Sequence, residues 1–361
     1  MKQEIEIPSD AAMHGIKNLL DDYIGITPND SIVICFWHEC RDIVTWVLYE
    51  LEERNQKFKI FPYGHRDESK FSYDLNKLID GIKAQNTNSR IILLICEDEV
   101  LSFSSYLKSL LPKSIVVWRI MNTSAHLFEQ AFAYRTKDLK NINAWLLSKL
   151  MTSEKQELRI ENNYGTSLNV VINNNKFKWI STFGVQKKNE ILILPTGEIN
   201  TFPEYISGTF VAFGAIHANI KLPFDTRLQH NPIQLEFRNG TLHSFTCKNQ
   251  QLNGFLELIF KEKHLTSIGE FGIGTNIGIT KFVENNSHIN ERFPGVHLGL
   301  GMHLQAKSDV RYKTPIHIDF ISPYGRIYYN KEHEPIALDQ LARVAHIETS
   351  HPANLSAEDG G

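Results

Sequence analysis

The segment SIVICFW, residues 31–37, is an apolar run with the length of one β-strand, and a helical spacing of apolar residues follows it directly over 41–55. The same alternation continues along the first 150 residues. The further strand-like runs are FKIFPY (58–63), RIILLIC (90–96) and SIVVWRI (114–120), with a second helical pattern over 98–112. Strand and helix in repetition are typical of βαβ units. The sequence therefore predicts an N-terminal α/β domain with a parallel sheet, which we place at residues 1–158.

From about residue 160 the pattern changes to short alternating runs separated by Gly, Asn and Pro. The runs are SLNVVI (167–172), FKWIST (177–182), EILILP (190–195), GTFVAFGAI (208–216), IQLEFRNGTLHSFTC (233–247), VHLGLGMHL (296–304) and IHIDFI (316–321). Asn239-Gly240 between two alternating segments is a strong hairpin signal, and 249–263 has a helical spacing. We therefore expect residues 159–361 to form a mostly antiparallel β (α+β) domain.

The composition excludes several classes of protein. The 361 residues carry 38 Lys and Arg against 41 Asp and Glu, a formal charge of −3, so no strong positive field would recruit nucleic acid or anionic lipid. The N-terminus MKQEIEIPSD does not read as a secretory signal, and no run approaches the roughly 18 apolar residues of a membrane span. We expect a cytoplasmic protein without a nucleic-acid or membrane partner. A phosphate-binding G-x-G-x-x-G loop does not follow the first run.

Acidic residues and histidines interrupt the apolar runs of the second half. In PIHIDF (315–320), His317 and Asp319 are two residues apart and point to the same face of a strand. Three other segments set an acid or a histidine amid glycines and apolar residues: LPTGEINTFP with Glu198, SIGEFGIGTN with Glu270, and FPGVHLGLG with His297. Carboxylates and neutral imidazoles are the usual ligands of Zn²⁺, Mn²⁺, Co²⁺ and Fe²⁺.

Each of these features also has a purely structural interpretation. Glu198 after Pro-Thr-Gly is typical of a solvated turn, and a single His such as His297 is more often a hydrogen-bonded core residue. His317 and Asp319 would also suit a buried pair, and the glycines of GEFGIGTN would also suit bulges or the close approach of strands. The histidines outside these segments, including His38, His65, His126 and His217, are expected to be structural.

Together these segments resemble the thermophilic metallopeptidases of the aminopeptidase T group. In the second half NYGTSLNVVI, LPTGEINTFP, PIQLEFRNG, IGEFGIGTN, VHLGLG and IHIDF occur in the family's order, and LLDDYIGITPNDSIVICF is similar to its opening helix and first strand. The resemblance covers most of the chain. It implies a metal-dependent aminopeptidase or a related hydrolase of peptides or small amides, and a homodimer.

The resemblance also implies a site with two divalent metal ions, Zn, Co or Mn. Its five ligands fall on Glu198, Glu270, His297, His317 and Asp319, with Glu270 matching the bridging residue. Glu198 and Glu270 are both candidates for the catalytic proton carrier, and the sequence does not separate a ligand from a base.

The chain departs from the family at one chemically important position. Members carry a Tyr seven residues after the histidine of the HxxLG motif, and here that position is Leu304. His303 is adjacent, but strand alternation sends it to the opposite face. The segment from His297 to His317 is also short, so we expect a trimmed substrate pocket.

Two other functions stay open. The fold implied by the resemblance is also similar to that of a ring-cleaving dioxygenase with one Fe(II) held by two histidines and a carboxylate, although Glu270 stands where we expect that site's other histidine. The second alternative is a catalytically altered metal-binding protein, which the replacement of the Tyr by Leu304 favours.

Overall fold

The computed structural model describes residues 7–65, 67–85, 89–97, 103–111, 115–186, 189–329 and 334–347. The chain forms two compact units. The first comprises residues 1–136 and 184–196, and the second comprises residues 137–183 and 197–361. This division differs from the single boundary expected after residue 158, because a helix before that boundary belongs to the second unit and a strand after it belongs to the first. Among the described residues, no helix combines the length and apolar character needed to cross a membrane.

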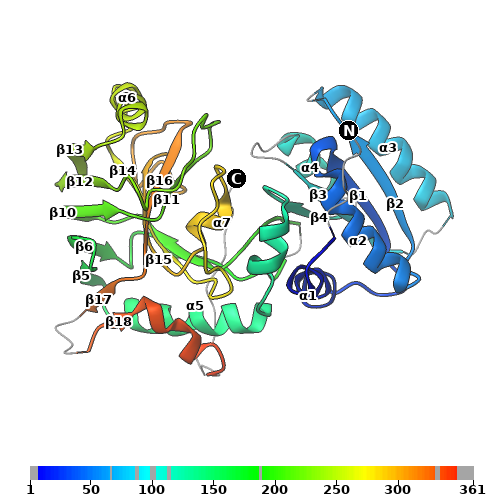
Figure 1. The fold of residues 1–361 in the computed structure, drawn as a ribbon, viewed down its shortest axis with the longest axis horizontal. Coiled ribbons are helices and arrows are strands. Elements are labelled where there is room, and N and C mark those ends of the chain that lie inside the picture. Colours follow the sequence, from blue (N-terminus) through cyan, green and yellow to red (C-terminus); the bar gives the residue numbers. More distant parts are fainter. Residues whose placement is uncertain are drawn as a thin grey trace. The chain divides into compact units, whose positions relative to one another are not determined.

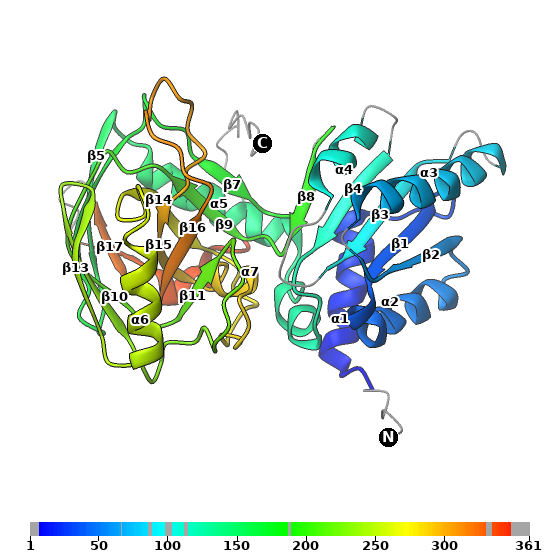
Figure 2. The ribbon, with the colours of Figure 1, turned by 90° about the horizontal axis from the view of Figure 1, so that it is seen from above.

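The first unit is a parallel α/β structure, as the strand and helix pattern predicts. Its five-stranded sheet has the order β2-β1-β3-β4-β8, and every pairing is parallel. Figure 2 shows α1 and α2 on one face and α3 and α4 on the other. The strands are β1 (Ser31–Trp37), β2 (Phe58–Tyr63), β3 (Ile91–Cys96), β4 (Ile115–Ile120) and β8 (Ile191–Leu194). The helices are α1 (Asp10–Asn18), η1 (Leu19–Ile24), η2 (His38–Cys40), α2 (Arg41–Glu53), α3 (Glu68–Gln85), α4 (Ser104–Leu110) and η4 (Leu127–Ala131).

One strand lies in a different sheet from the one we expected. The run EILILP at 190–195 reads as part of the antiparallel half, but it forms β8 and pairs in parallel with β4 of the first unit. A short apolar run carries no information about its partner strand, so the sequence pattern alone did not place it. The expected helix over 98–112 is seen as α4 alone in the described part of that segment.

The second unit consists of two antiparallel sheets with helices at their margins. Its strands are β5 (Lys155–Glu161), β6 (Ser167–Asn173), β7 (Ile180–Thr182), β9 (Glu198–Thr201), β10 (Tyr205–Ala212), β11 (Ala215–Ala218), β12 (Ile233–Arg238), β13 (Thr241–Cys247), β14 (Ile268–Gly274), β15 (Gly295–Gly301), β16 (His317–Pro323), β17 (Arg326–Tyr329) and β18 (Ile336–Ala337). Its helices are α5 (Thr136–Leu150), α6 (Gln250–Ile259), α7 (His288–Glu291) and η5 (Leu338–Val344). Figure 1 shows α5 and α6 at opposite ends of this unit.

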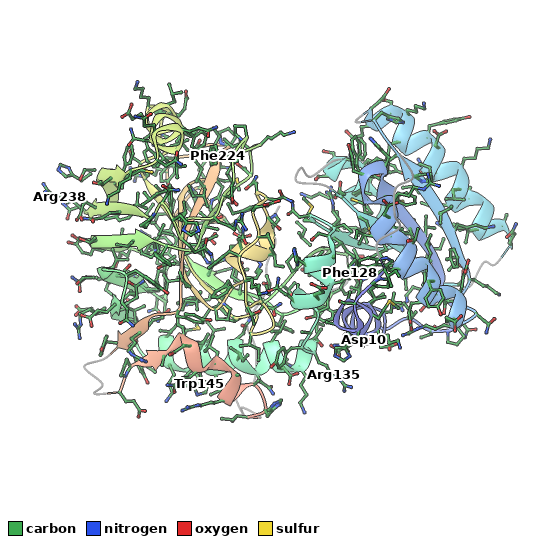
Figure 3. All side chains as sticks on the ribbon, viewed as in Figure 1. Asp10, Phe128, Arg135, Trp145, Phe224 and Arg238 are labelled. Atoms are coloured by element: carbon green, nitrogen blue, oxygen red, sulfur yellow. The ribbon has the colours of Figure 1, made fainter. Side chains whose placement is uncertain are left out.

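The two sheets of the second unit share one hydrophobic core. A seven-stranded sheet has the order β13-β12-β10-β6-β5-β17-β18, and a six-stranded sheet has the order β11-β16-β15-β14-β9-β7. Apolar side chains from both sheets form one buried cluster, which includes Phe210 of the larger sheet and Phe271 and Phe320 of the smaller. Side chains fill this space in Figure 3, where Phe224 lies beside α6 and packs edge-on against Phe255 at 5.3 Å.

Two local features follow directly from the sequence. Asn239 and Gly240 both have positive φ, 50° and 76°, which is the conformation of a two-residue hairpin turn, and they connect β12 to β13 as expected. The run at 208–216 is divided into β10 and β11 because the chain turns at Gly214, where a side chain would meet the Phe282 ring at 2.4 Å. The expected fold class is therefore confirmed, with a parallel α/β part and antiparallel sheets.

Candidate functional site

One face of the six-stranded sheet carries the acidic and histidine side chains that the sequence singled out. The five residues lie on four neighbouring strands: Glu198 on β9, Glu270 on β14, His297 on β15, and His317 and Asp319 on β16. All five are in the second unit, and four of them are buried, with His317 half-buried.

The strand register brings these residues together. Glu270 lies opposite Gly299, Gly299 opposite Asp319, and Asp319 opposite a further residue, His217 of β11. Directly opposed residues of antiparallel strands point to the same face. A row of four positions therefore crosses four strands, and three of its side chains are ionisable.

The other face of these strands is apolar. Residues that alternate with the polar ones enter the shared core, among them Ile199, Phe271, Leu298, Ile318 and Phe320, all fully buried. This alternation fixes the register, because a shift of one residue would exchange the polar and apolar faces. Burial of the apolar face thus places the polar groups side by side on the opposite face.

Glycines on the polar face make room for the site. A side chain at Gly272 would place its Cβ 1.9 Å from Nε2 of His297, and one at Gly299 would place it 2.5 Å from the His317 ring and 2.8 Å from Cβ of Glu270. The glycines two residues after Glu270 and His297 are therefore required by close approach of side chains, whereas the sequence suggested bulges or close approach of strands.

The first group of ligand atoms surrounds His297. Its Nε2 lies 3.3 Å from Oε1 of Glu270 and 3.7 Å from Oε1 of Glu198. The His297 side chain is fully buried, and its Nδ1 has no hydrogen-bond partner in the described part of the chain. Glu198 also accepts a bond from Nδ2 of Asn200 and contacts Nη1 of Arg292.

The second group surrounds His317. Its Nε2 lies 3.0 Å from Oδ1 of Asp319 and 4.0 Å from Oε2 of Glu270. Its Nδ1 donates to the backbone oxygen of Met302 at 2.9 Å, so Nε2 is the nitrogen that faces the carboxylates. A backbone acceptor on the remote nitrogen is how metal-binding histidines are commonly held.

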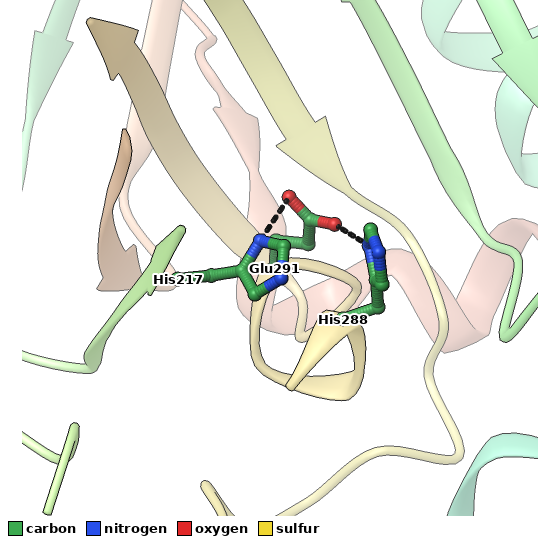
Figure 4. A group of neighbouring side chains, drawn as sticks. All are labelled: His217, His288 and Glu291. Carbon is green, nitrogen blue, oxygen red and sulfur yellow. Dashed lines mark hydrogen bonds and ion pairs between the residues drawn. The ribbon is translucent and has the colours of Figure 1, made fainter. Parts of the chain in front are cut away.

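Three further residues join the site that the sequence did not indicate. His217, expected to be structural, has its Nδ1 3.5 Å from Oδ2 of Asp319 and 3.5 Å from Oε2 of Glu291. Nδ1 of His288 lies 2.5 Å from the other oxygen of Glu291. Figure 4 shows the Glu291 carboxylate between the two imidazoles. His288 and Glu291 are three residues apart on α7, a spacing that would have indicated a shared face.

Mutual contacts set the protonation of the buried groups. Burial lowers the pKa of the His317 imidazole, but Asp319 opposes it and the pKa rises to about 10. For His217 burial is likewise outweighed, mainly by Glu291, and the pKa rises to about 9. Burial opposes ionisation of Asp319, but His317 holds the pKa of that carboxyl well below its usual range. Without a metal ion, protons on the imidazoles therefore balance the carboxylates.

Leu304 stands where the family carries a Tyr, and neither it nor the adjacent His303 supplies a phenol there. Leu304 follows the end of β15 and is 43% exposed. His303 does not replace it, since its Nε2 donates to the backbone oxygen of Tyr312 at 2.8 Å and its Nδ1 accepts from the amide of Gln305. The Tyr312 hydroxyl donates to the backbone oxygen of Ile268 at 2.8 Å.

The buried acidic and histidine groups could hold a metal ion. In the described part of the chain, four sets of ligand atoms lie within 4.8 Å of one another: Glu198, Glu270 and His297; Glu270, His317 and Asp319; Glu291, His297 and Asp319; and His217, His288 and Glu291. Metal–ligand bonds of about 2.1 Å at a tetrahedral angle separate two ligand atoms by about 3.4 Å. The separations of 3.0–4.0 Å around His297 and His317 fit that geometry. Glu198 is the exception, because Arg292 contacts it.

Comparison with known proteins supports the fold more strongly than any function. Residues 205–328, about a third of the chain, match the family model of crocagin biosynthetic protein CgnE/B. Wild-type AmpT from Thermus thermophilus is a similar solved structure, with a TM-score of 0.54 and 12% identity over 88% of this chain and 94% of that chain. No protein with a curated description matches the sequence. The likeness to AmpT shows a distant aminopeptidase-like fold.

Proposed function

We propose that this protein is a metal-dependent aminopeptidase or a related hydrolase that acts on a peptide or a small amide. One observation carries the proposal: five residues from four separate segments of the chain lie on one face of one sheet, and their ligand atoms are 3.0–4.0 Å apart around His297 and His317. The aminopeptidase-like fold supports it. We further propose two divalent ions, Zn, Co or Mn, and a homodimer that light scattering would test.

The chain's own residues would divide the work of hydrolysis. Bound divalent ions would acidify a water molecule and polarise the substrate carbonyl. Glu270 is the better placed proton carrier, since its side chain is 11% exposed against 3% for Glu198. Asn200 and Arg292 hold the Glu198 carboxylate in place. His297 is fully buried, and His317 is oriented by the Met302 carbonyl.

The test is hydrolysis of a mixture of short peptides by protein loaded with Zn²⁺, Mn²⁺ or Co²⁺, followed by mass spectrometry. We expect loss of N-terminal residues and a fall of about a thousandfold or more in Glu270→Gln, the range expected when a general base and ligand is removed. Glu257→Gln on α6 is the matched control, because Glu257 bonds only to Asn253 of its own helix among the contacts described. Equal rates in the two variants would contradict the proposal.

A second candidate function is metal binding without hydrolysis. The specific observation in its favour is that Leu304 stands in place of the Tyr while His303 is held by Tyr312 and Gln305. The match of residues 205–328 to a family described as biosynthetic is compatible with it. Bound metal with no turnover of any peptide would support this candidate. A single oxygen-sensitive Fe²⁺ would instead support the dioxygenase alternative.

A further inference from the structure

Arg292 brings a permanent positive charge to one end of the site. Its side chain is 12% exposed, and its Nη1 contacts Glu198 and lies 3.4 Å from Oε1 of Glu291. An arginine guanidinium stays charged at neutral pH. A guanidinium bound to a carboxylate neutralises it and repels a divalent ion at the same oxygens. Glu198 is therefore a poor metal ligand in this chain.

The opposite end of the site offers other metal-ligand atoms in place of the Glu198 carboxylate. Nδ1 of His217 faces two carboxylate oxygens, from Glu291 and Asp319, at 3.5 Å each. These gaps are longer than a normal hydrogen bond, for which nitrogen and oxygen lie about 2.9 Å apart. They match the separation of about 3.4 Å between two ligands of one tetrahedral ion. The centroids of the His288 and His217 rings lie 4.3 Å apart, and each ring faces a different oxygen of Glu291 (Figure 4).

Asp319 connects this group to the rest of the site. Its Oδ1 faces His317 and its Oδ2 faces His217, and its side chain is fully buried. A carboxylate with one oxygen toward each of two donor groups has the arrangement of a bridging ligand. Glu270 lies on β14, two strands away from Asp319 and across Gly299 of β15, and its carboxylate also faces His317.

The segment that carries His288 and Glu291 is held firmly against β11. The buried Asn286 donates to the backbone oxygens of Ala218 and Ile220 and accepts from the amide of Ala218 at 2.8 Å. Ser287 caps α7, and Asn290 exchanges two hydrogen bonds with the backbone of Val283. Such hydrogen bonds hold metal-coordinating side chains in position before the metal ion binds.

We propose that Asp319 bridges two cation positions, one formed with His317 and Glu270 and one formed with His217, Glu291 and His288, and that Arg292 occupies the cationic place beside Glu198. The second position takes a divalent ion of the kind that imidazole and carboxylate prefer, Zn²⁺ or Mn²⁺. This inference rests on the metal-binding part of the proposed function and does not depend on hydrolysis.

The test is the metal content of the full-length protein and three variants after loading with Zn²⁺ and removal of free metal. We expect two equivalents in the wild type, one in His217→Ala and one in Glu291→Gln, and two in Glu198→Gln. A loss of one equivalent in Glu198→Gln, with two retained in His217→Ala, would overturn the inference and restore the arrangement implied by the family resemblance. One equivalent in the wild type would also overturn it.

Anomalous diffraction from Zn²⁺-loaded wild-type crystals provides a measurement that does not depend on any variant folding. We expect one peak within coordination distance of His217, Glu291 and Asp319, and another beside His317. A peak beside Glu198 in place of the first overturns the inference. Metal at the expected positions without peptide turnover leaves the inference standing and removes hydrolysis, whereas protein that takes up no metal removes both.

Discussion

The two units bury charge in opposite ways. In the first unit Glu97 and Arg119 are both 1% exposed, and Nε of Arg119 donates to Oε2 of Glu97 at 2.6 Å. Nη1 of Arg119 also donates to Ser104, and the Tyr63 hydroxyl lies 3.5 Å from the second Glu97 oxygen. Each charge there has a permanent partner on the chain.

The second unit buries four carboxylates close together, those of Glu198, Glu270, Glu291 and Asp319. Arg292 contacts two of them, Glu198 and Glu291. The remaining balance comes from the imidazoles, whose charge depends on a bound proton. The balancing charges of the second unit are exchangeable, as the proposed metal binding requires, whereas those of the first unit are fixed parts of the chain.

Removal of one partner of the buried Glu97–Arg119 pair should destabilise the protein more than any other change proposed here. Arg119→Met leaves Glu97 charged and buried, which costs about 3–5 kcal/mol of unfolding free energy. Hydrogen exchange of β3 and β4 measures the loss. The double change Glu97→Leu with Arg119→Met removes both charges and should recover most of the stability. If Arg119→Met alone were as stable as the wild type, the contrast between fixed and exchangeable charge in the two units would be wrong.

Removal of metal should affect only the second unit. At a free metal concentration a hundred times the dissociation constant, binding stabilises the folded state by about 2.7 kcal/mol. We therefore expect EDTA to accelerate hydrogen exchange in β14, β15 and β16 and to leave β1 and β3 unchanged. Equal acceleration in both sheets would contradict the contrast between fixed and exchangeable charge.

A side chain added at Gly299 should disturb the site by steric overlap, without a change of charge. Gly299→Ala places a methyl group against His317 and Glu270, and such overpacking costs about 1–3 kcal/mol. We expect reduced metal content as well, measured by elemental analysis. Gly254→Ala is the matched control, because a Cβ there meets nothing within 4 Å, and in helix α6 it should stabilise the protein by up to about 1 kcal/mol. Normal metal content in Gly299→Ala would argue against the glycine's role.

A smaller effect concerns the protons carried by the imidazoles of His217 and His317. At pH 7 the imidazoles of His217 and His317 are protonated in the metal-free protein, since their pKa values are about 9 and 10. A histidine must be deprotonated to bind a metal, so loading releases protons and weakens as the pH falls. Calorimetric titration in buffers of different ionisation enthalpy counts the protons, and His217→Asn should release fewer. Heats independent of the buffer would contradict this account.

The sequence predicted the fold class because periodicity directly reflects which face of an element is buried. The alternation of strands and helices before residue 150 and the hairpin at Asn239-Gly240 both follow from local physics. Pairing partners do not, which is why β8 was placed in the wrong sheet.

Candidate site residues could be predicted where their spacing along a single strand places them on one face. His317 and Asp319 share a face by alternation, and glycines follow Glu270 and His297 at steps of two. His217 had no such neighbour, because it joins the site through its register with Asp319, 102 residues away. Arg292 was missed for a related reason, since only the folded chain shows which carboxylate it reaches.

The path of β8 has a practical consequence for dividing the molecule. A fragment that begins at residue 159 keeps the apolar strand ILIL but loses β4, and an unpaired apolar strand is prone to aggregate. A better fragment would begin at Lys137 and omit residues 184–196. The amide of Gly197 donates to the backbone oxygen of Thr182 at 3.0 Å, so the cut ends already meet and a short linker would close them.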